Sequence, residues 1–381
     1  MNKCVFISDS FKGSLSTFEL IDIFKDCFSS IFPNCELLSF PCADGGEGTS
    51  EVFSYIFKGN TIKLMSKDAN LNDIETSYFL SEDNIAYIDV ASCISLPKTN
   101  DKNPMKTTSY GVGLLIKDAI NRNIKKIYLG LGGSSTNDMG LGIVSSLGGK
   151  FFDADKNEFL PTGGNLNLIS DMDLTEFYKN ISGIKINGLC DVKNKLLGKD
   201  GASLVFSLQK GATEKEGQIL EKNMSILVKF LLSKSFDNIF DIDGSGAAGG
   251  IGACLLSFFK GRLISGIDYL LETIDFEDKI KDADVIFTGE GKFDNQSKEG
   301  KAIDGIRKIA YKYNVPVVVI AGGASMNSED MINKGIASIV TTNRLPLAFE
   351  DIKEKSKIFY KMTVLNTLRL IKLGEKISEH K

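Results

Sequence analysis

The sequence predicts an α/β fold with two α/β domains, one of them a doubly wound, Rossmann-like parallel sheet built from both ends of the chain. Near the N-terminus, short apolar runs alternate with amphipathic stretches, which is the order of strand–helix units. The same alternation returns near the C-terminus, where residues 315–320 form a continuous apolar run typical of a strand buried on both faces. Between these parts the pattern changes, which predicts a second, mixed α/β domain as an insertion.

The first elements follow from the hydrophobic pattern. We expect strands at residues 4–7 and 37–40 and helices at residues 17–32 and 49–57. Ser14 or Ser16 is suited to cap the first helix, because a serine hydroxyl accepts a hydrogen bond from the first turn. Each strand therefore leads through a loop into a helix N-terminus, where unpaired N–H groups favour an anionic ligand.

The inserted domain begins with three short runs separated by Asn and Asp, which predict a strand meander at residues 62–65, 75–79 and 85–90. A helix at 113–121, a strand at 127–131, a helix at 140–147 and a hairpin at 151–159 should follow.

The expected elements near the C-terminus are a strand at 285–287 leading into a loop, a helix at 301–313, strands at 315–321 and 337–340, and a helix at 354–371. We expect residues 1–60 and 260–381 to form the Rossmann-like domain and residues 61–259 the insertion. Because ligands favour clefts between domains, the active site is expected there.

Composition narrows the class of protein. Lys and Arg number 45 against 49 Asp and Glu, and no basic stripe is visible, so neither nucleic acid nor a membrane is an expected partner. The 7 cysteines are scattered without a C-x-x-C pair, which argues against a disulfide framework or structural zinc. With no secretory signal and no apolar run long enough to span a membrane, a cytoplasmic location is expected.

The only histidine is His380, next to the C-terminus. Catalysis by a serine–histidine or cysteine–histidine pair, or by histidine-bound zinc, is therefore nearly excluded. Acid–base chemistry would fall to carboxylates, lysine or groups of the substrate.

Six motifs carry the acids, lysines, amides and glycines that such chemistry needs, and most of them follow strand-like runs. They are Asp9-Ser10-Phe11-Lys12-Gly13-Ser14, Ala43-Asp44-Gly45-Gly46-Glu47-Gly48-Thr49, Gly130-Leu131-Gly132-Gly133-Ser134-Ser135-Thr136-Asn137-Asp138, Asp191-Val192-Lys193-Asn194, Gly244-Ser245-Gly246-Ala247-Ala248-Gly249-Gly250 and Thr288-Gly289-Glu290-Gly291-Lys292-Phe293-Asp294-Asn295-Gln296. Glycines let backbone N–H groups approach a phosphate, and an acid at a strand end can hold Mg²⁺ or accept a proton. A P-loop sequence is absent.

Each motif also has a plain structural interpretation. Lys12 would then be a solvated loop lysine, and Asp191 the start of an Asx turn with Asn194. Gly244, Gly246 and Gly249 match G-x-G-x-x-G, but the acidic run before them is a poor strand, so close helix packing is the alternative to dinucleotide binding.

Taken in order, the six motifs resemble those of the bacterial glycerate kinase family. The resemblance runs from residue 9 to residue 296, which is most of the chain. It implies ATP-dependent phosphorylation of D-glycerate, two α/β domains and Mg²⁺. It also implies reaction at the 2-hydroxyl, giving 2-phosphoglycerate, although 3-phosphoglycerate stays open as the product. A homodimer is compatible with this assignment.

With that reaction in view, we expect three sets of site residues. Those for catalysis are Lys12, Asp191 and Asp294, the two acids also serving as Mg²⁺ ligands. Those for glycerate are Asp9, Ser10, Asp44, Gly45, Gly46 and Glu290. Those for ATP are Gly132, Gly133, Ser134, Ser135, Asn137, Gly244, Gly246 and Gly249. Lys12 and the Gly45–Gly46 turn would bind the glycerate carboxylate.

The chain departs from the family pattern at Lys195, Met139, Asp243 and Ile303, which replace a common proline, glycine, proline and proline. These changes affect loop shape and remove no charged or amide group of the expected site. Two other functions remain as alternatives: an NAD-linked hydroxy-acid dehydrogenase using Gly244–Gly249, and a non-catalytic regulator that binds a sugar acid. The absence of a DNA-binding element speaks against the regulator.

Overall fold

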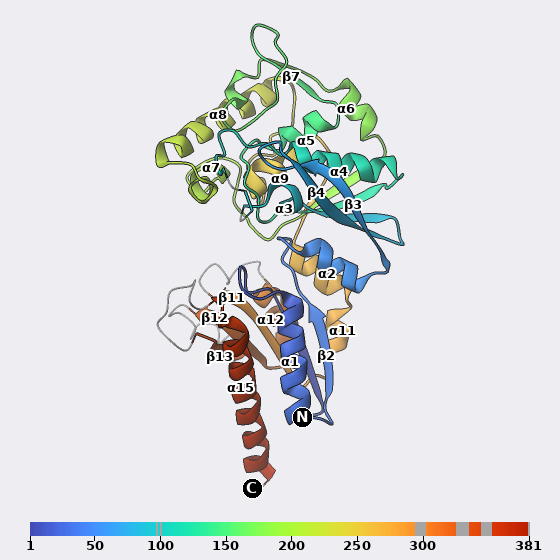
Figure 1. Ribbon diagram of the computed structural model, residues 1–381, viewed down its shortest axis with the longest axis vertical. Helices are drawn as coiled ribbons and strands as arrows, with labels where there is room; N and C mark the ends of the chain where they lie inside the picture. The colour runs from blue at the N-terminus through green and yellow to red at the C-terminus, as the bar shows by residue number, and fades with distance from the viewer. Residues whose placement is uncertain (97, 100, 294–301, 325–334, 344–352, 380–381) are drawn as a thin grey trace. The chain divides into compact units, whose positions relative to one another are not determined.

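The computed structural model describes residues 1–96, 98–99, 101–293, 302–324, 335–343 and 353–379, and the chain divides into two compact units (Figure 1). Unit 1 consists of Met1–Asp44 and Ile267–Lys381, and unit 2 of Gly45–Gly266. Both units are α/β, and unit 1 is built from both ends of the chain, which confirms the predicted fold class.

Unit 1 contains a sheet of five parallel strands in the order β13-β12-β11-β1-β2. The strands are β1 (Lys3–Ser8), β2 (Glu36–Pro41), β11 (Val285–Phe293), β12 (Val317–Ala324) and β13 (Ile336–Thr341). Numbered within the unit, the order is 2-1-3-4-5, the flavodoxin-like order of doubly wound sheets. The direction of winding reverses between β1 and β11, and ligands of such sheets bind outside the carboxyl ends of strands at that point.

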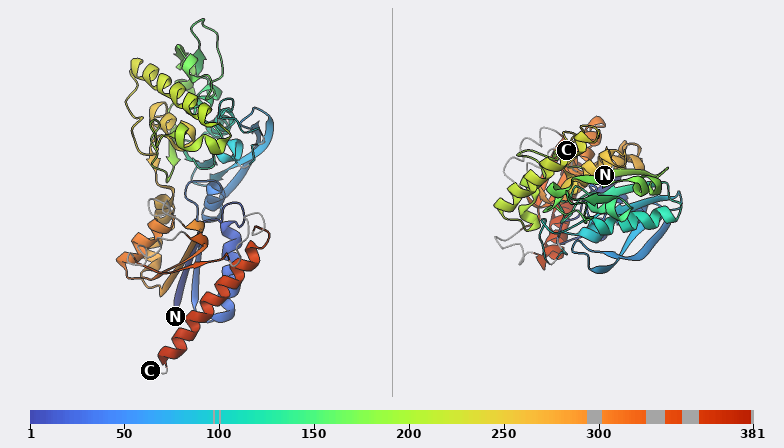
Figure 2. Two further views of the ribbon diagram at one scale, coloured as in Figure 1. Left: turned by 90° about the vertical axis from the view of Figure 1, so that its left-hand side faces the viewer. Right: turned by 90° about the horizontal axis from the view of Figure 1, so that it is seen from above.

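Helices cover both faces of this sheet (Figure 2). On one face lie α1 (Thr17–Ile31) and α15 (Ser356–Glu379), and on the other α10 (Gly266–Thr273), α11 (Phe276–Ile280) and α12 (Ala302–Lys312). Phe24 of α1 stacks on Phe6 with ring centroids 4.3 Å apart and lies 4.9 Å from the ring of Phe287. Helix α1 starts at Ser16, whose hydroxyl forms a reciprocal capping box with Glu19, as the sequence predicted for one of two serines.

Unit 2 is built on a six-stranded mixed sheet in the order β10-β9-β6-β5-β4-β3. Its strands are β3 (Gly59–Lys67), β4 (Asp73–Ser81), β5 (Ile85–Asp89), β6 (Lys126–Gly130), β9 (Lys185–Leu189) and β10 (Leu263–Ile264). The first three form the predicted antiparallel meander, and β5, β6, β9 and β10 run parallel. A separate pair, β7 (Lys150–Phe152) and β8 (Asp171–Asp173), is antiparallel.

The helices of unit 2 are α2 (Thr49–Ile56), α3 (Ala91–Ile94), α4 (Tyr110–Asn121), α5 (Leu141–Ser146), α6 (Thr175–Asn180), α7 (Ala202–Phe206), α8 (Glu214–Ser233) and α9 (Ala247–Ser257), with the 3₁₀ helices η1 (Leu166–Leu168) and η2 (Leu208–Lys210). Most of them contribute to one large apolar core, whereas Phe53 of α2 stacks on Tyr87 of β5. Among the described residues, no helix combines the length and the apolar character that crossing a membrane requires.

One local expectation changes, and two others hold. Residues 288–293 continue strand β11 and are not a loop. The run 236–241 is not a strand, so the Gly244–Gly249 motif lacks the strand that a dinucleotide fingerprint needs before it. The expected hairpin near residues 151–159 is present as a tight turn, in which the Asp153 N–H donates to the Asn157 carbonyl at 3.1 Å.

Candidate active site

The carboxyl ends of β1, β2 and β11 bring four predicted site residues of unit 1 together. Asp9 directly follows β1, Asp44 lies just beyond β2, and Glu290 belongs to β11. The Asp9 N–H donates to the Gly289 carbonyl at 3.0 Å, which fixes Asp9 against β11 at the reversal of the winding. The predicted cluster around the first two motifs therefore lies where the fold class places a ligand.

Lys12 is presented by a tight loop between two buried anchors, Phe11 and Leu15. The Phe11 N–H donates to the Leu15 carbonyl at 2.8 Å, and Gly13 takes a φ of +83°, which glycine adopts without strain. The Lys12 side chain is 67% exposed, and its Nζ lies 3.1 Å from Oδ2 of Asp44. The apolar anchors thus hold the loop while the ammonium group stays available to a ligand.

Thr17 joins the ends of the two N-terminal strands. Its Oγ1 donates to the Ser8 carbonyl at 2.8 Å and accepts from the Cys42 N–H at 3.0 Å. Sequence reasoning missed Thr17, yet this residue helps to set the spacing of the two motifs. Gly291 lets strand β11 approach the loop that carries Lys12, because a Cβ at this position would lie only 3.3 Å from Cα of Phe11.

The charges of this cluster shift the pKa values of Asp9 and Lys12. Burial, followed by the charge of Asp44, raises the pKa of Asp9 to about 7, while Lys12 and the Ser10 N–H act in the opposite direction. The charge of Asp44, followed by those of Asp9 and Glu290, raises the pKa of Lys12 above its usual value. At neutral pH the site therefore holds a charged lysine beside a carboxyl group that can readily gain or lose a proton.

In unit 2, the Gly45–Gly46 turn lies against the carboxyl ends of β6 and β9. The Gly132 N–H donates to the Gly45 carbonyl at 3.1 Å. Gly45 has a φ of +81°, and a Cβ there would lie 2.7 Å from the Leu189 carbonyl oxygen. The turn needs glycine for close approach, so its backbone is set by packing whether or not it also binds a ligand.

Asp89, which sequence reasoning missed, holds the start of helix α2. It ends β5, is 6% exposed, and accepts from the Gly48 N–H at 3.1 Å and from Ser50 Oγ at 2.9 Å. The Ser50 N–H donates to the same carboxylate at 3.1 Å. Burial is the main cause that raises the pKa of Asp89 to about 7. This acid thereby fixes the Gly48–Ser50 turn in unit 2.

Replacing Asp89 with Ala should lower the free energy of unfolding by about 2–4 kcal/mol, because three donors near the start of α2 lose their acceptor. Ser50→Ala removes only the hydroxyl bond and should cost about 1 kcal/mol. Urea unfolding followed by circular dichroism measures both. Equal small losses in the two variants would show that Asp89 does not hold the turn.

The loop after β6 is mostly internal. Ser135 and Asn137 are fully buried, and Ser134 is 5% exposed. The Ser135 Oγ donates to the Ile94 carbonyl at 3.0 Å, and Asn137 Nδ2 donates to Ser203 Oγ at 3.1 Å. Gly132 and Gly133 are the parts of this loop that reach the surface.

Gly246 and Gly249 make close backbone contacts. A Cβ at Gly246 would lie 2.2 Å from the Lys195 carbonyl oxygen, and one at Gly249 would lie 2.0 Å from that of Thr136. Gly244 has a φ of +83° just before them. These contacts support the packing interpretation of the G-x-G-x-x-G match.

Two predicted catalytic acids remain, Asp191 and Asp294. Asp191 follows β9, and its Oδ1 accepts from the Gly266 N–H at 3.0 Å. Asp294 lies outside the described residues. In the part of the chain that is described, no group of three or more His, Cys, Asp or Glu residues could hold a metal ion.

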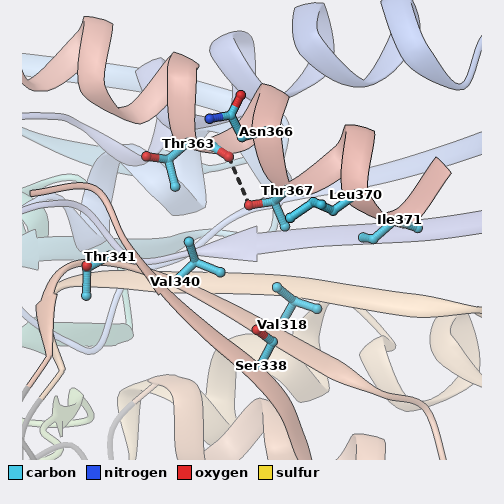
Figure 3. A pocket seen from close by; sticks show the side chains of 9 residues that line it. All are labelled: Val318, Ser338, Val340, Thr341, Thr363, Asn366, Thr367, Leu370 and Ile371. Atoms are coloured by element: carbon cyan, nitrogen blue, oxygen red, sulfur yellow. Dashed lines mark hydrogen bonds between the residues drawn. The ribbon is translucent and has the colours of Figure 1, made fainter. Parts of the chain in front are cut away.

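Two hollows accompany these elements. One, of about 350 Å³, is polar and lies beside the start of α2, where Glu47, Ser50, Asp89 and Lys98 are among its lining residues. The other, of about 480 Å³, lies between α15 and strands β12 and β13 of unit 1 (Figure 3). None of the described residues that line the second hollow is charged, so it does not suit an anionic substrate.

Comparison with known proteins agrees with the motif pattern. The model of the glycerate kinase family matches residues 4–372. A glycerate kinase of Bacillus cereus is 35% identical over 375 residues, covering 98% of each chain. The glycerate 2-kinase of Escherichia coli is 37% identical over 323 residues, covering 84% of this chain and 85% of its own.

A solved structure extends the likeness to the fold. It is that of a protein from Salmonella typhimurium LT2 described as a candidate glycerate kinase 2, with 33% identity and a TM-score of 0.82. The match covers 98% of this chain and 99% of that one. With the motifs in order, a family match over nearly the whole chain and a shared fold, this chain belongs to the glycerate kinase family.

Proposed function

We propose that this protein transfers the γ-phosphoryl group of ATP to the 2-hydroxyl of D-glycerate, giving 2-phosphoglycerate and ADP. The observation that carries the proposal is the cluster of Asp9, Lys12, Asp44 and Glu290 at the carboxyl ends of β1, β2 and β11. Family membership supports it, as does the name glycerate 2-kinase of the Escherichia coli relative.

In this proposal, glycerate binds through its carboxylate to Lys12 and to the Gly45–Gly46 turn, while Ser10 helps to orient it. Asp9 accepts the proton of the reacting hydroxyl, because its pKa of about 7 is suited to a general base at neutral pH. The hydroxyl oxygen then bonds to the γ-phosphorus as the bond to the β–γ bridging oxygen breaks, and ADP leaves. Asp44 and Glu290 hold Lys12 in its charged form.

The nucleotide is assigned to unit 2 in the same proposal. The backbone N–H group of Gly133 and the Ser134 hydroxyl would bind phosphate oxygens, since glycine-rich turns present such donors. Gly132 would shape this turn, because its own N–H donates to the Gly45 carbonyl. Ser135, Asn137, Gly244, Gly246 and Gly249 would act by shaping these loops, in line with their internal contacts.

Mg²⁺ is expected as the counter-ion of the ATP phosphates. Proteins commonly hold Mg²⁺ through one or two carboxylates together with substrate phosphates. Asp191 is the described residue that would hold it, with Asp294 as the second carboxylate of the proposal. When bound, the ion would neutralise phosphate charge. A cytoplasmic location and a homodimer remain predictions.

The test of the reaction is ADP release, measured with a coupled assay. We expect release from ATP only when D-glycerate and Mg²⁺ are both present. 3-Hydroxypropanoate, which lacks the proposed reacting 2-hydroxyl, and reactions without acceptor serve as controls. Absence of glycerate-dependent ADP release at saturating substrate would refute the proposed function, and an NAD-linked absorbance change with glycerate would favour the dehydrogenase.

The position of phosphorylation has its own measurement. Phosphorus NMR of the product should show 2-phosphoglycerate. A product that phosphoglycerate kinase consumes without added mutase would be the 3-isomer, and it would overturn the 2-hydroxyl assignment while leaving the kinase assignment intact.

A further inference from the structure

Lys210 is a buried lysine at the end of η2 in unit 2, and the site described above does not use it. Lys210 is only 3% exposed. Its Nζ donates to Ser134 Oγ at 3.2 Å and to the Thr136 carbonyl at 2.7 Å. Both acceptors are uncharged, and no ion pair with this nitrogen forms among the described residues. Such a buried ammonium group is costly unless an anion comes close.

The bond to Ser134 also determines what that serine can do. A hydroxyl has one proton to donate, and the Ser134 oxygen already accepts from Lys210. Across the residues that the structure describes, no acceptor for the Ser134 proton is found, so this proton is available to a ligand. Its neighbour Ser135 differs, because it donates to the Ile94 carbonyl at 3.0 Å and accepts from Thr99 at 3.1 Å.

The position of Ser134 favours an anionic ligand. It directly follows Gly132 and Gly133, the part of the loop that reaches the surface, where Gly133 has a φ of +77°. The Gly133 N–H, the Ser134 hydroxyl proton and the positive charge of Lys210 together form a set of groups suited to bind an oxyanion.

We propose that Lys210 is a positioning residue that holds the Ser134 hydroxyl as a donor to a substrate oxyanion, and that its charge strengthens binding of that oxyanion. The oxyanion is a phosphate of ATP or the carboxylate of glycerate, which share this chemistry. The inference rests on the proposed function and adds to it a recognition element in unit 2.

The experiment compares Lys210→Met, Ser134→Ala and the double variant with the wild type, and determines kcat and both KM values. We expect each single change to raise the KM of one and the same substrate at least 10-fold, with a smaller effect on kcat. The double variant should resemble the worse single variant, because the two residues act as one unit. The substrate whose KM rises identifies the oxyanion.

Lys185→Met is the matched control, since Lys185 is exposed at the opposite, N-terminal end of β9. It should leave both KM values unchanged.

A second readout is proton uptake at pH 8, measured by calorimetry in two buffers with either Mg·ATP or D-glycerate as the probe. Burial lowers the pKa of Lys210 to about 8, Asp138 being the charged group that acts on it in the opposite direction. An approaching anion should raise that pKa, so the wild type takes up protons and Lys210→Met does not.

The failures are distinguishable. If the wild type shows no glycerate-dependent ADP release, the proposed function is wrong whatever the variants do. If the wild type is active but neither KM moves in Lys210→Met, or the two single effects multiply in the double variant, the inference is wrong and the function stands. Should Lys210→Met fail to fold, Ser134→Ala decides, because an unchanged KM there overturns the proposal.

Discussion

Replacing Lys12 with Met is expected to lower kcat/KM at least about 100-fold, which corresponds to about 2.7 kcal/mol of lost transition-state stabilisation. The ammonium group is the cation that the loop between Phe11 and Leu15 presents beside Asp44. The free energy of unfolding should change by less than about 1 kcal/mol, because the side chain is 67% exposed and exposed ion pairs stabilise little. Steady-state kinetics and urea unfolding measure the two effects.

Lys308→Met provides the control for the loss of an exposed, ion-paired lysine in the same unit. Lys308 lies on α12, its side chain is 63% exposed, and its Nζ is 2.7 Å from Asp304. It should retain wild-type kinetics. Near-normal kinetics in the Lys12 variant, or an equal loss in both variants, would make Lys12 a solvated loop residue.

Asp9→Asn is the second change with a large expected effect, and its consequences for activity and stability are opposite. Activity should fall by about 100-fold or more, because an amide cannot accept the hydroxyl proton. Stability at pH 8 should rise by about 1–3 kcal/mol, since the variant no longer places a buried carboxylate close to Asp44. Such a gain with loss of activity is typical of a group kept for function.

The direction of the pH dependence follows from the raised pKa of Asp9. In the unfolded chain the pKa of this group is near its ordinary value of 3.8, and in the folded protein it is about 7. The folded state therefore binds more protons between these values, so this group's contribution to stability is lost as pH rises from about 4 to about 7. The wild type should gain kcat/KM over the upper part of the same window.

Comparing wild type and Asp9→Asn isolates this residue from Asp89, whose pKa is also raised to about 7. The stability difference between the two proteins should grow from pH 5 to pH 8, and the variant should lose the rise of kcat/KM through pH 7. A stability difference that stays flat, together with an unchanged pH–rate profile, would exclude Asp9 as the base.

The sequence predicted the elements of unit 1 well because each of them has a local cause. Strands β1 and β12 are continuous apolar runs, and helix α1 has an amphipathic pattern with the Ser16–Glu19 capping box at its start. Strand β11 was predicted to end at residue 287, although it continues to Phe293, because its glycines are typical of a loop. Its residues Gly289 and Gly291 resemble a loop, but Gly289 is required because a Cβ would lie 2.0 Å from the Ile320 carbonyl oxygen of the next strand.

The candidate site was predictable where motif residues follow a strand, as Asp9 follows β1 and Asp44 follows β2. Asp89 and Lys210 were missed because their importance depends on partners far away in the sequence. Asp89 accepts its hydrogen bonds from the Gly48–Ser50 turn, and Lys210 donates to the loop after β6. Neither local hydrophobicity nor residue type distinguishes such an acid or lysine from one on the surface.

The place of β1 in its sheet has a consequence for how the protein is made. On one side β1 pairs with β2, which follows soon after it, and on the other with β11, where Cys4 faces Val285. During synthesis, unit 2 is complete before β11 has emerged from the ribosome. Until then, β1 lacks its partner strand β11, and the apolar face of α1 lacks the C-terminal elements that pack against it. At ordinary rates of elongation that delay is on the order of ten seconds. Unpaired strand edges and uncovered apolar faces of this kind favour aggregation of a nascent chain.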